Sequence, residues 1–336
     1  MSGPSPSLLV ADLRVTYATG AGDVRAVSGV TLDVHRGERI GLVGESGSGK
    51  SATALAISGL LPRSADTSGS IRLAGQELTA LGRRDRRKVC GARIGMIFQN
   101  PQSSLNPAMT IGQQIAEPLH LHLGLSRSAA RERAIELLGE VGMPAPARSI
   151  DEYPHRFSGG MRQRAMIAIA LSCDPELIIA DEPTTALDVT IQAQILELLA
   201  TRCREHDAAL LVVTHDLGVL AGLADRILVM YAGRILEEGP VDSIYYRAQH
   251  PYTLALLGAI SRIDGPLERL RAIPGDPPSG LDTPTGCVFH DRCPHAIDIC
   301  RTEVPMLLDG ADPGHRRACH LADRIDGPRP AAGASR

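Results

Sequence analysis

The 336-residue chain has no tryptophan, only 3% aromatic residues and very few lysines. Among its 35 basic residues, only Lys50 and Lys88 are lysines. The shortage of aromatic rings leaves few platforms on which the bases of a single nucleic-acid strand could stack. The formal net charge of −3 argues against a general nucleic-acid binder, which needs a basic face to meet phosphates. The rarity of lysine makes the two that are present worth inspecting.

Long apolar runs are missing as well. No stretch approaches the roughly 20 apolar residues that are needed to span a bilayer. The first 15 residues lack the basic start and apolar run of a secretion signal. We therefore expect a cytosolic protein whose seven cysteines are not paired in disulfides.

The order of apolar runs and glycine turns predicts an α/β fold. Strands are expected at 39–43, 177–180 and 209–214, and a hairpin at 227–237. Helical spacing at 128–141 and 160–172 predicts a helical subdomain inserted at about 100–173. We expect a main domain over 1–240, a small cysteine-rich extension over 241–323, and a disordered tail over 324–336.

A glycine-rich loop follows the first of these strands and fits the pattern G-x-x-x-x-G-K-[ST]. Its backbone N–H groups would surround phosphate oxygens, with Lys50 on the β- and γ-phosphates and the Ser51 hydroxyl on Mg²⁺. A chance glycine-rich turn is the alternative, and the loop does not distinguish kinases, GTPases and motor ATPases. The candidate nucleotide-binding residues here are Gly44, Ser46, Gly47, Ser48, Gly49, Lys50, Ser51 and Ala52.

Five further motifs follow in a fixed order. They are Ile97-Phe98-Gln99, Phe157-Ser158-Gly159-Gly160-Met161, Leu177-Ile178-Ile179-Ala180-Asp181-Glu182-Pro183, Thr185-Ala186-Leu187-Asp188 and Thr214-His215-Asp216. In order and spacing, residues 7–240 resemble the ATP-binding subunits of ABC transporters. Phe157 and Met161 stand where Leu and Gln are usual, and this variant resembles the dipeptide/oligopeptide importer branch. The resemblance implies a P-loop NTPase fold, with a RecA-like core, an antiparallel β subdomain and the inserted helical subdomain.

The resemblance also implies roles for single residues. Asp181 would hold Mg²⁺ together with Ser51 and Gln99. Glu182 resembles the family's catalytic carboxylate, which polarises the attacking water. His215 would contact the γ-phosphate. Taken alone, Gln99 could be a polar loop residue and His215 a buried, hydrogen-bonded histidine.

Other residues of the motifs imply a second nucleotide-contacting surface. Ser158, Gly159 and Gly160 open a helix and would cap the ATP that is held by an opposite subunit. Asp188 would lie across the same interface, so hydrolysis requires two ATPase subunits that face head to tail. Tyr17 is the expected adenine-stacking aromatic, although it could be an ordinary strand residue.

The extension contains Cys287, Cys293, Cys300 and Cys319. Four thiolates from a loop-rich region would suit tetrahedral Zn²⁺ or a four-cysteine iron–sulfur cluster, and spacing alone does not choose between them. The extension resembles that of peptide-importer ATPases, some of which hold a [4Fe–4S] cluster with four cysteines. We therefore expect a [4Fe–4S] cluster of structural role, with zinc and metal-free packing as alternatives.

The resemblance implies an ATP-hydrolysing subunit that powers import of dipeptides or oligopeptides. Its partners would be two membrane permeases, a second and paralogous ABC ATPase, and indirectly an extracytoplasmic solute-binding protein, with no nucleic acid. The subunit would sit peripherally on the cytoplasmic face of the inner membrane. An importer of nickel, glutathione or another small solute stays open. A soluble ABC ATPase of DNA repair is disfavoured, because the 108 positions from Lys50 to Ser158 hold no sustained heptads.

Overall fold

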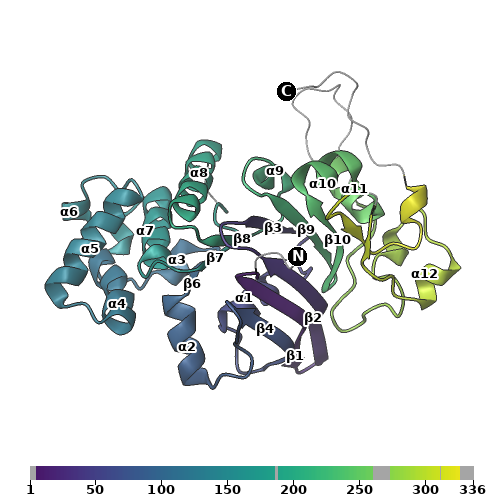
Figure 1. Ribbon diagram of the computed structural model, residues 1–336, viewed down its shortest axis with the longest axis horizontal. Helices are drawn as coiled ribbons and strands as arrows, with labels where there is room; N and C mark the ends of the chain where they lie inside the picture. Colours follow the sequence, from purple (N-terminus) through teal and green to yellow (C-terminus); the bar gives the residue numbers. More distant parts are fainter. Residues whose placement is uncertain (1–4, 186–187, 260–272, 311, 326–336) are drawn as a thin grey trace.

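The computed structural model describes residues 5–185, 188–259, 273–310 and 312–325, and its centre is an eight-stranded sheet (Figure 1). The strand order is β11-β12-β10-β9-β3-β8-β7-β6. The five strands from β9 to β6 are parallel, and β10, β12 and β11 are added antiparallel at one edge. The strands are β3 (Arg39–Val43), β6 (Ile94–Ile97), β7 (Leu177–Asp181), β8 (Ala209–Thr214), β9 (Arg226–Tyr231), β10 (Arg234–Pro240), β11 (Leu308–Asp309) and β12 (Arg316–Arg317).

The parallel strands are continuous apolar runs because both of their faces are covered. Every residue of β7 and β8 is buried. The strands expected at 39–43, 177–180 and 209–214 are confirmed, and the hairpin at 227–237 is formed by β9 and β10. The sequence did not predict β6, whose four residues are too few to show a pattern of their own.

A second, antiparallel sheet has the order β2-β1-β4-β5. Its strands are β1 (Leu8–Thr19), β2 (Gly22–Val34), β4 (Ala65–Leu73) and β5 (Gln76–Glu77). Apolar residues on its inner face, including Leu8, Val10, Leu13 and Val15, pack in one core with α1 (Lys50–Ser58) and with Ile179 and Leu211 of the main sheet. The antiparallel β subdomain is therefore present, and α1 lies between the two sheets.

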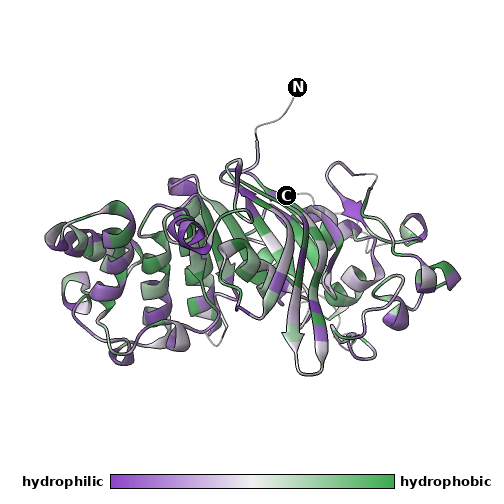
Figure 2. Ribbon diagram, turned by 90° about the horizontal axis from the view of Figure 1, so that it is seen from below, coloured by the Kyte–Doolittle hydropathy of each residue, from purple (hydrophilic) through white to green (hydrophobic). Residues whose placement is uncertain are grey.

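The helical subdomain lies beyond the β6 edge of the main sheet (Figure 1). It consists of α3 (Pro101–Ser104), α4 (Ile111–Leu123), α5 (Arg127–Glu140), α6 (Pro146–Ser149), the short 3-10 helix η1 (Pro154–Arg156) and α7 (Gly159–Leu171). Its helices carry both apolar and hydrophilic residues (Figure 2), and apolar residues such as Ile115, Leu138 and Ile167 are buried in the core. Thr110 and Gln113 form a reciprocal capping box at the start of α4. The bounds of the insertion as a separate subdomain, expected at about 100–173, stay a prediction.

The remaining helices flank the main sheet or lie in the carboxy-terminal part. They are α2 (Arg83–Ala92), α8 (Val189–Glu205), α9 (Leu217–Leu220), α10 (Val241–Arg247), α11 (Pro251–Gly258), α12 (Asp298–Thr302) and the 3-10 helices η2 (His290–Arg292) and η3 (Ala322–Arg324). In the described parts of the chain, no helix has the length and apolar character to cross a membrane.

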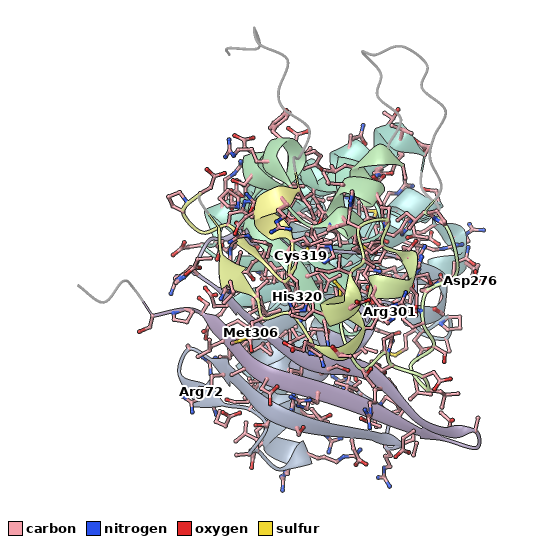
Figure 3. All side chains as sticks on the ribbon, turned by 90° about the vertical axis from the view of Figure 1, so that its right-hand side faces the viewer. Arg72, Asp276, Arg301, Met306, Cys319 and His320 are labelled. Atoms are coloured by element: carbon pink, nitrogen blue, oxygen red, sulfur yellow. The ribbon has the colours of Figure 1, made fainter. Side chains whose placement is uncertain are left out.

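The carboxy-terminal extension is joined to the main sheet. Arg316 and Arg317 of β12 pair with Glu238 and Glu237 of β10, so that the sheet continues into the extension. Figure 3 views this part from outside, with Cys319 and His320 near the middle of the view. The boundary at 240 stays a prediction. Of the tail expected at 324–336, Arg324 ends η3, and residues 326–336 lie outside the described part.

Candidate functional site

The loop between β3 and α1 surrounds its own lysine. Gly49 has a φ of 103°, and a Cβ there would lie 2.3 Å from the carbonyl oxygen of Ala26. Lys50 is 5% exposed, and its Nζ donates to the carbonyl oxygens of Gly44 (2.7 Å) and Glu45 (2.8 Å). The ammonium group is therefore held at the N-terminal end of α1, where N–H groups and the helix dipole favour an anion. The other predicted residues lie in the same turn or the first turn of α1: Ser46, Gly47, Ser48, Ser51 and Ala52.

Ser51, in the first turn of α1, meets Asp181 at the carboxyl end of β7. Ser51 Oγ donates a hydrogen bond to Asp181 Oδ1 at 3.1 Å, and Asp181 is 7% exposed. Burial raises the pKa of Asp181, and the charge of Glu182 raises it further, against the opposing effects of Ser51 and Lys50. A hydroxyl and a carboxylate are oxygen ligands of the kind that Mg²⁺ takes. Two of the predicted magnesium ligands are therefore in contact.

Glu182 follows β7 and collects three hydrogen bonds. Gln99 Nε2 lies 2.7 Å and the Thr185 hydroxyl 2.9 Å from its Oε2, and His215 Nδ1 lies 3.0 Å from Oε1. Burial alone would raise the pKa of Glu182, but the bonds from His215 and Thr185 outweigh it and lower the pKa. The backbone of Glu182 has a φ of 46°, an uncommon conformation for a residue with a side chain. An ionised carboxylate held in this way can polarise a water molecule.

The charges of the site are organised around Lys50. Burial lowers the pKa of its ammonium group, and the carboxylates of Glu182, Asp181 and Glu45 raise it again. Besides Lys50, the Arg292 guanidinium pairs with one of these carboxylates, that of Glu45, at 2.6 Å. A divalent cation next to Asp181 would be the largest charge in this site and would reduce the repulsion between the carboxylates.

Tyr17 lies partly buried on β1. It pairs with Val24 of β2 and with Ala65 of β4. Val24 is two residues before Ala26, whose carbonyl oxygen lies against Gly49 of the phosphate loop. Burial raises the pKa of its hydroxyl. The strand register therefore places Tyr17 close in the sheet to the residue that contacts the phosphate loop, and its adenine-stacking role stays a prediction.

The motif residues expected to contact a second nucleotide lie at the starts of two neighbouring helices. Ser158 Oγ accepts from the Met161 N–H at 3.3 Å, and Asp188 accepts from the Ile191 N–H at 3.0 Å. A Cβ on Gly160 would lie 3.1 Å from the side chain of Ile191, so the starts of α7 and α8 are adjacent. Within the described ranges, no hydrogen bond joins Ser158 or Asp188 to the phosphate loop. Of the predicted motif residues, Ser158 is the residue that caps α7, and Gly159 and Gly160 are its first two residues.

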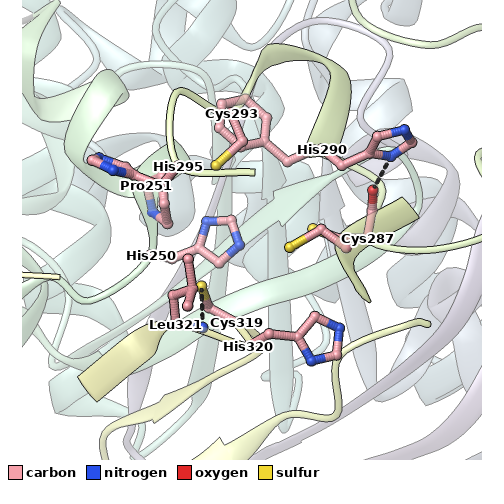
Figure 4. A pocket seen from close by; sticks show the side chains of 11 residues that line it. His250, Pro251, Cys287, His290, Cys293, His295, Cys319, His320 and Leu321 are labelled. Atoms are coloured by element: carbon pink, nitrogen blue, oxygen red, sulfur yellow. Dashed lines mark hydrogen bonds between the residues drawn. The ribbon is translucent and has the colours of Figure 1, made fainter. Parts of the chain in front are cut away.

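The four cysteines of the extension line one pocket (Figure 4). The sulfur atoms of Cys287, Cys293 and Cys319 point toward a common space in that view, and Cys300 also lines it. Burial raises the pKa of Cys287 and of Cys319 to about 11 each, and the neighbouring cysteines contribute to both increases. The four thiols are therefore close enough to interact electrostatically. The pocket is also lined by His250, Phe289, His290, His295 and His320.

The arrangement of side chains in this pocket does not by itself form a metal site. In the described part of the chain, no group of three or more His, Cys, Asp or Glu side chains is placed to hold a metal ion. A zinc ion needs its four sulfurs at about 2.3 Å from one centre. The expected metal site is therefore not supported as such, and the structure establishes only that the four cysteines surround one space.

The comparisons with known proteins decide the family. The chain is 49% identical over 319 residues to the oligopeptide transport ATP-binding protein OppD of Salmonella typhimurium, covering 94% of this chain and 95% of that protein. It is 47% identical over 314 residues to the dipeptide transport ATP-binding protein DppD of Escherichia coli, covering 93% and 96%. The chain belongs to the oligopeptide/dipeptide branch of the ABC transporter ATP-binding proteins. The resemblance seen in the motifs is confirmed.

Two family models match this ABC transporter ATP-binding protein. The ABC transporter family matches residues 27–185, and the family described as oligopeptide/dipeptide transporter, C-terminal region, matches 236–300. Among solved structures, the dimeric post-hydrolysis state of the ATP-binding cassette MJ0796 bound to ADP and Pi is similar, with a TM-score of 0.63 and 29% identity over 70% of this chain and 98% of that one. These comparisons establish the P-loop ABC ATPase fold. They do not confirm a separate, cysteine-rich carboxy-terminal extension.

Sequence reasoning missed two features of this ABC ATPase site. Thr185 belongs to a recognised motif, yet its hydrogen bond to Glu182 required the fold. Glu45 occupies a variable position of the phosphate-loop pattern, and no sequence signal indicated that Tyr252 and Arg292, more than 200 positions away, contact it.

Proposed function

We propose that this protein hydrolyses ATP to power the import of peptides through separate membrane permease subunits. The observation that carries the proposal is the ionised Glu182, held by Gln99 and His215 beside the Ser51–Asp181 pair. That arrangement sets a carboxylate that can polarise water next to residues suited to MgATP. The relatives named as oligopeptide and dipeptide transport ATP-binding proteins support peptides as the cargo.

Each side chain has a defined task in this proposal. Lys50 and the loop N–H groups bind the β- and γ-phosphates, while Ser51 and Asp181 provide oxygen ligands for Mg²⁺. Mg²⁺, when bound with the nucleotide, neutralises charge on the phosphates. Glu182 orients the attacking water and accepts its proton. His215 bonds to Glu182 through Nδ1. The γ-phosphate would then be bound by its other ring nitrogen, Nε2.

The proposal includes a head-to-tail pair of ATPase subunits. The adjacent starts of α7, at Ser158, and of α8, at Asp188, would face the nucleotide of the opposite subunit, and the similar cassette MJ0796, described as dimeric, supports such a pair. The opposite subunit would be a paralogue. Two permeases contact the helical subdomain, a solute-binding protein delivers the cargo outside, and the ATPase sits on the cytoplasmic face of the inner membrane.

The test is Glu182→Gln in the intact transporter with its permeases. Without the carboxylate charge, ATP binding persists, whereas the rate of ATP hydrolysis falls by about 100-fold or more. Nucleotide binding, phosphate release and uptake of labelled peptides are measured in proteoliposomes. Glu197→Gln on the exposed face of α8 is the matched control and retains hydrolysis. Normal hydrolysis by Glu182→Gln would refute the catalytic role of Glu182. If the wild-type transporter hydrolyses ATP and takes up nickel or glutathione but no peptide, the cargo assignment changes.

We also propose that the cysteine pocket holds a [4Fe–4S] cluster through Cys287, Cys293, Cys300 and Cys319. Such a cluster binds its thiolates at four separate irons, so the sulfurs surround a larger space than one ion requires. The support for this proposal is that all four thiols line one pocket. The cluster would supply folding energy to a region with few apolar residues, and a structural role follows.

Iron and acid-labile sulfide are measured on the full chain purified without oxygen, together with its visible absorbance. About four irons and four sulfides per chain are expected, and Cys319→Ser is expected to lose them. Cys90→Ser, a cysteine outside the pocket, keeps them. Iron-free, colourless wild-type protein would overturn the cluster, and one zinc per chain would replace it by the zinc alternative.

A further inference from the structure

Glu45 of the phosphate loop is held by residues from the far end of the chain. Its backbone N–H donates to the Tyr252 hydroxyl at 2.8 Å. Its carboxylate accepts two hydrogen bonds from Arg292, from Nη1 at 2.6 Å and from Nη2 at 3.1 Å. Its carbonyl oxygen accepts from Lys50 Nζ at 2.8 Å. One residue therefore joins the phosphate-binding lysine to α11 and to the segment before Cys293.

The Arg292 side chain is anchored before it reaches Glu45. It is 5% exposed, its Nε donates to the carbonyl oxygen of Pro274 at 2.8 Å, and Nη2 donates to that of Ile273 at 3.3 Å. Nη1 also donates to the Tyr231 hydroxyl at 3.2 Å. A guanidinium fixed on three sides presents its bidentate edge in one orientation, which a flexible lysine would not do.

A rigid aromatic cluster supports these contacts. Tyr231, Tyr252 and Phe289 are each at most 1% exposed, and their ring centroids lie 4.6–5.3 Å apart. Such pairs add to the stabilisation that burial provides. Phe289 also lines the cysteine pocket, so the packing under the phosphate loop continues into that pocket. The carboxy-terminal part is therefore in direct contact with the nucleotide site of the same chain.

We propose that Arg292 and Tyr252 position the phosphate loop through Glu45, so that affinity for ATP depends on the carboxy-terminal part of the chain. The inference rests on the proposed ATPase function and identifies how its nucleotide site is held. Both residues are positioning residues, because they act on Glu45 and not on the nucleotide. The carbonyl oxygen of Glu45 in turn accepts a hydrogen bond from Lys50. A glycine-rich loop has many accessible conformations, and fixing one of them before ATP arrives lowers the entropy cost of binding.

The first experiment is Arg292→Gln in the full chain. The dissociation constant for MgATP is expected to rise roughly tenfold, a typical size for coupling between contacting groups. In the intact transporter, the KM for ATP rises similarly while kcat changes little, because Glu182 and its partners are untouched. The matched control is Arg316→Gln, which breaks the ion pair between the extension and Glu238 on β10. It is expected to lower the melting temperature and leave the affinity for ATP unchanged.

A double-mutant cycle excludes a general loss of structure. Glu45→Gln should weaken ATP binding as Arg292→Gln does, and the double variant should be no weaker than either single variant, since both remove one interaction. Tyr252→Phe should also weaken binding, by removing the acceptor of the Glu45 N–H. Unchanged affinity in folded Arg292→Gln and Glu45→Gln variants overturns the inference, as does an equal loss in Arg316→Gln. Failure of the intact wild-type transporter to hydrolyse ATP refutes the proposed function instead.

Discussion

At the scale of single residues, the two lysines of the chain have opposite environments. Lys50 is almost fully buried and is bonded to the carbonyl oxygens of its own loop. Lys88 has an exposed side chain whose partner is Asp85, at 2.8 Å on the same helix. Arginine could replace the exposed Lys88 without loss. At position 50, the planar guanidinium of an arginine would not fit the space that the compact ammonium group of Lys50 occupies.

Lys50→Ala is therefore expected to weaken ATP binding by about 10-fold to 100-fold, because it removes a charged hydrogen-bond donor from the phosphates. The dissociation constant of MgATP, measured by titration calorimetry on the full chain, checks this. Lys88→Ala, an exposed lysine of the same chain, is the control and should bind ATP as the wild type does. Equal affinities in the two variants would remove Lys50 from its assigned role.

The motifs predicted which residues gather at the site, and the fold determined how they bond. Gln99, Glu182 and His215 are far apart in the chain and were expected to share one nucleotide site on resemblance alone. Their hydrogen bonds to one carboxylate depend on the ends of β6, β7 and β8 being adjacent in the sheet. Thr185 had no role until the turn after β7 placed its hydroxyl on Glu182.

At the scale of elements, the periodic and fully apolar segments were predictable. The strands β3, β7 and β8 and the helices α5 and α7 occur within one residue of the expected bounds. The short strands β6 and β12 were not foreseen, because strands of two to four residues carry no periodicity. Their existence depends on a neighbouring strand that supplies hydrogen bonds.

The hairpin of β4 and β5 carries a pH-dependent contribution to stability. Glu77 accepts hydrogen bonds from the hydroxyls of Ser70 and Thr79 and from the backbone N–H of Ile71 at 3.1 Å. Burial alone would raise the pKa of Glu77, but these hydrogen bonds outweigh it and lower the pKa to about 2 from 4.5. The native state therefore favours the ionised form, and this stabilisation is present above pH 4.5 and is lost as the pH falls toward 2.

Glu77→Gln should consequently lower the free energy of unfolding by about 1–2 kcal/mol at pH 7. The difference from the wild type should shrink as the pH falls below about 4.5. Urea denaturation at a series of pH values measures both effects. Glu132→Gln on the exposed face of α5 should show neither. A difference between Glu77→Gln and wild type that is the same at pH 3 and pH 7 would contradict this explanation.

At the scale of the whole molecule, a buried carboxylate joins the extension to the ATPase core. Glu237 of β10 is fully buried and accepts from His315 Nε2 at 2.8 Å, from the Gln249 N–H at 2.6 Å and from the His250 N–H at 3.2 Å. The donors come from the chain before α11 and from the segment that leads into β12. The extension is thus held to the main sheet by a polar network as well as by strand pairing.

His315→Ala is expected to destabilise the protein by about 3 kcal/mol, because it leaves a buried carboxylate without one of its partners. Arg247→Ala, which breaks the exposed pair with Asp312, should cost under about 1 kcal/mol. Both values come from the midpoint and slope of urea denaturation of the full chain. A loss in His315→Ala no larger than that in Arg247→Ala would show that the network contributes little to holding the extension.

The sequence by itself determined the family, the phosphate loop and the positions of β3, β7 and β8, because these depend on local patterns of glycine, apolar runs and motif residues. Only the tertiary structure decided that four distant cysteines line one pocket and that the chain's far end holds Glu45. Contacts between residues more than 200 positions apart leave no mark on local spacing, since they arise from packing of whole elements. The scarce lysine and the scarce aromatic rings meet there, with Lys50 bonded to Glu45 beside Tyr231, Tyr252 and Phe289.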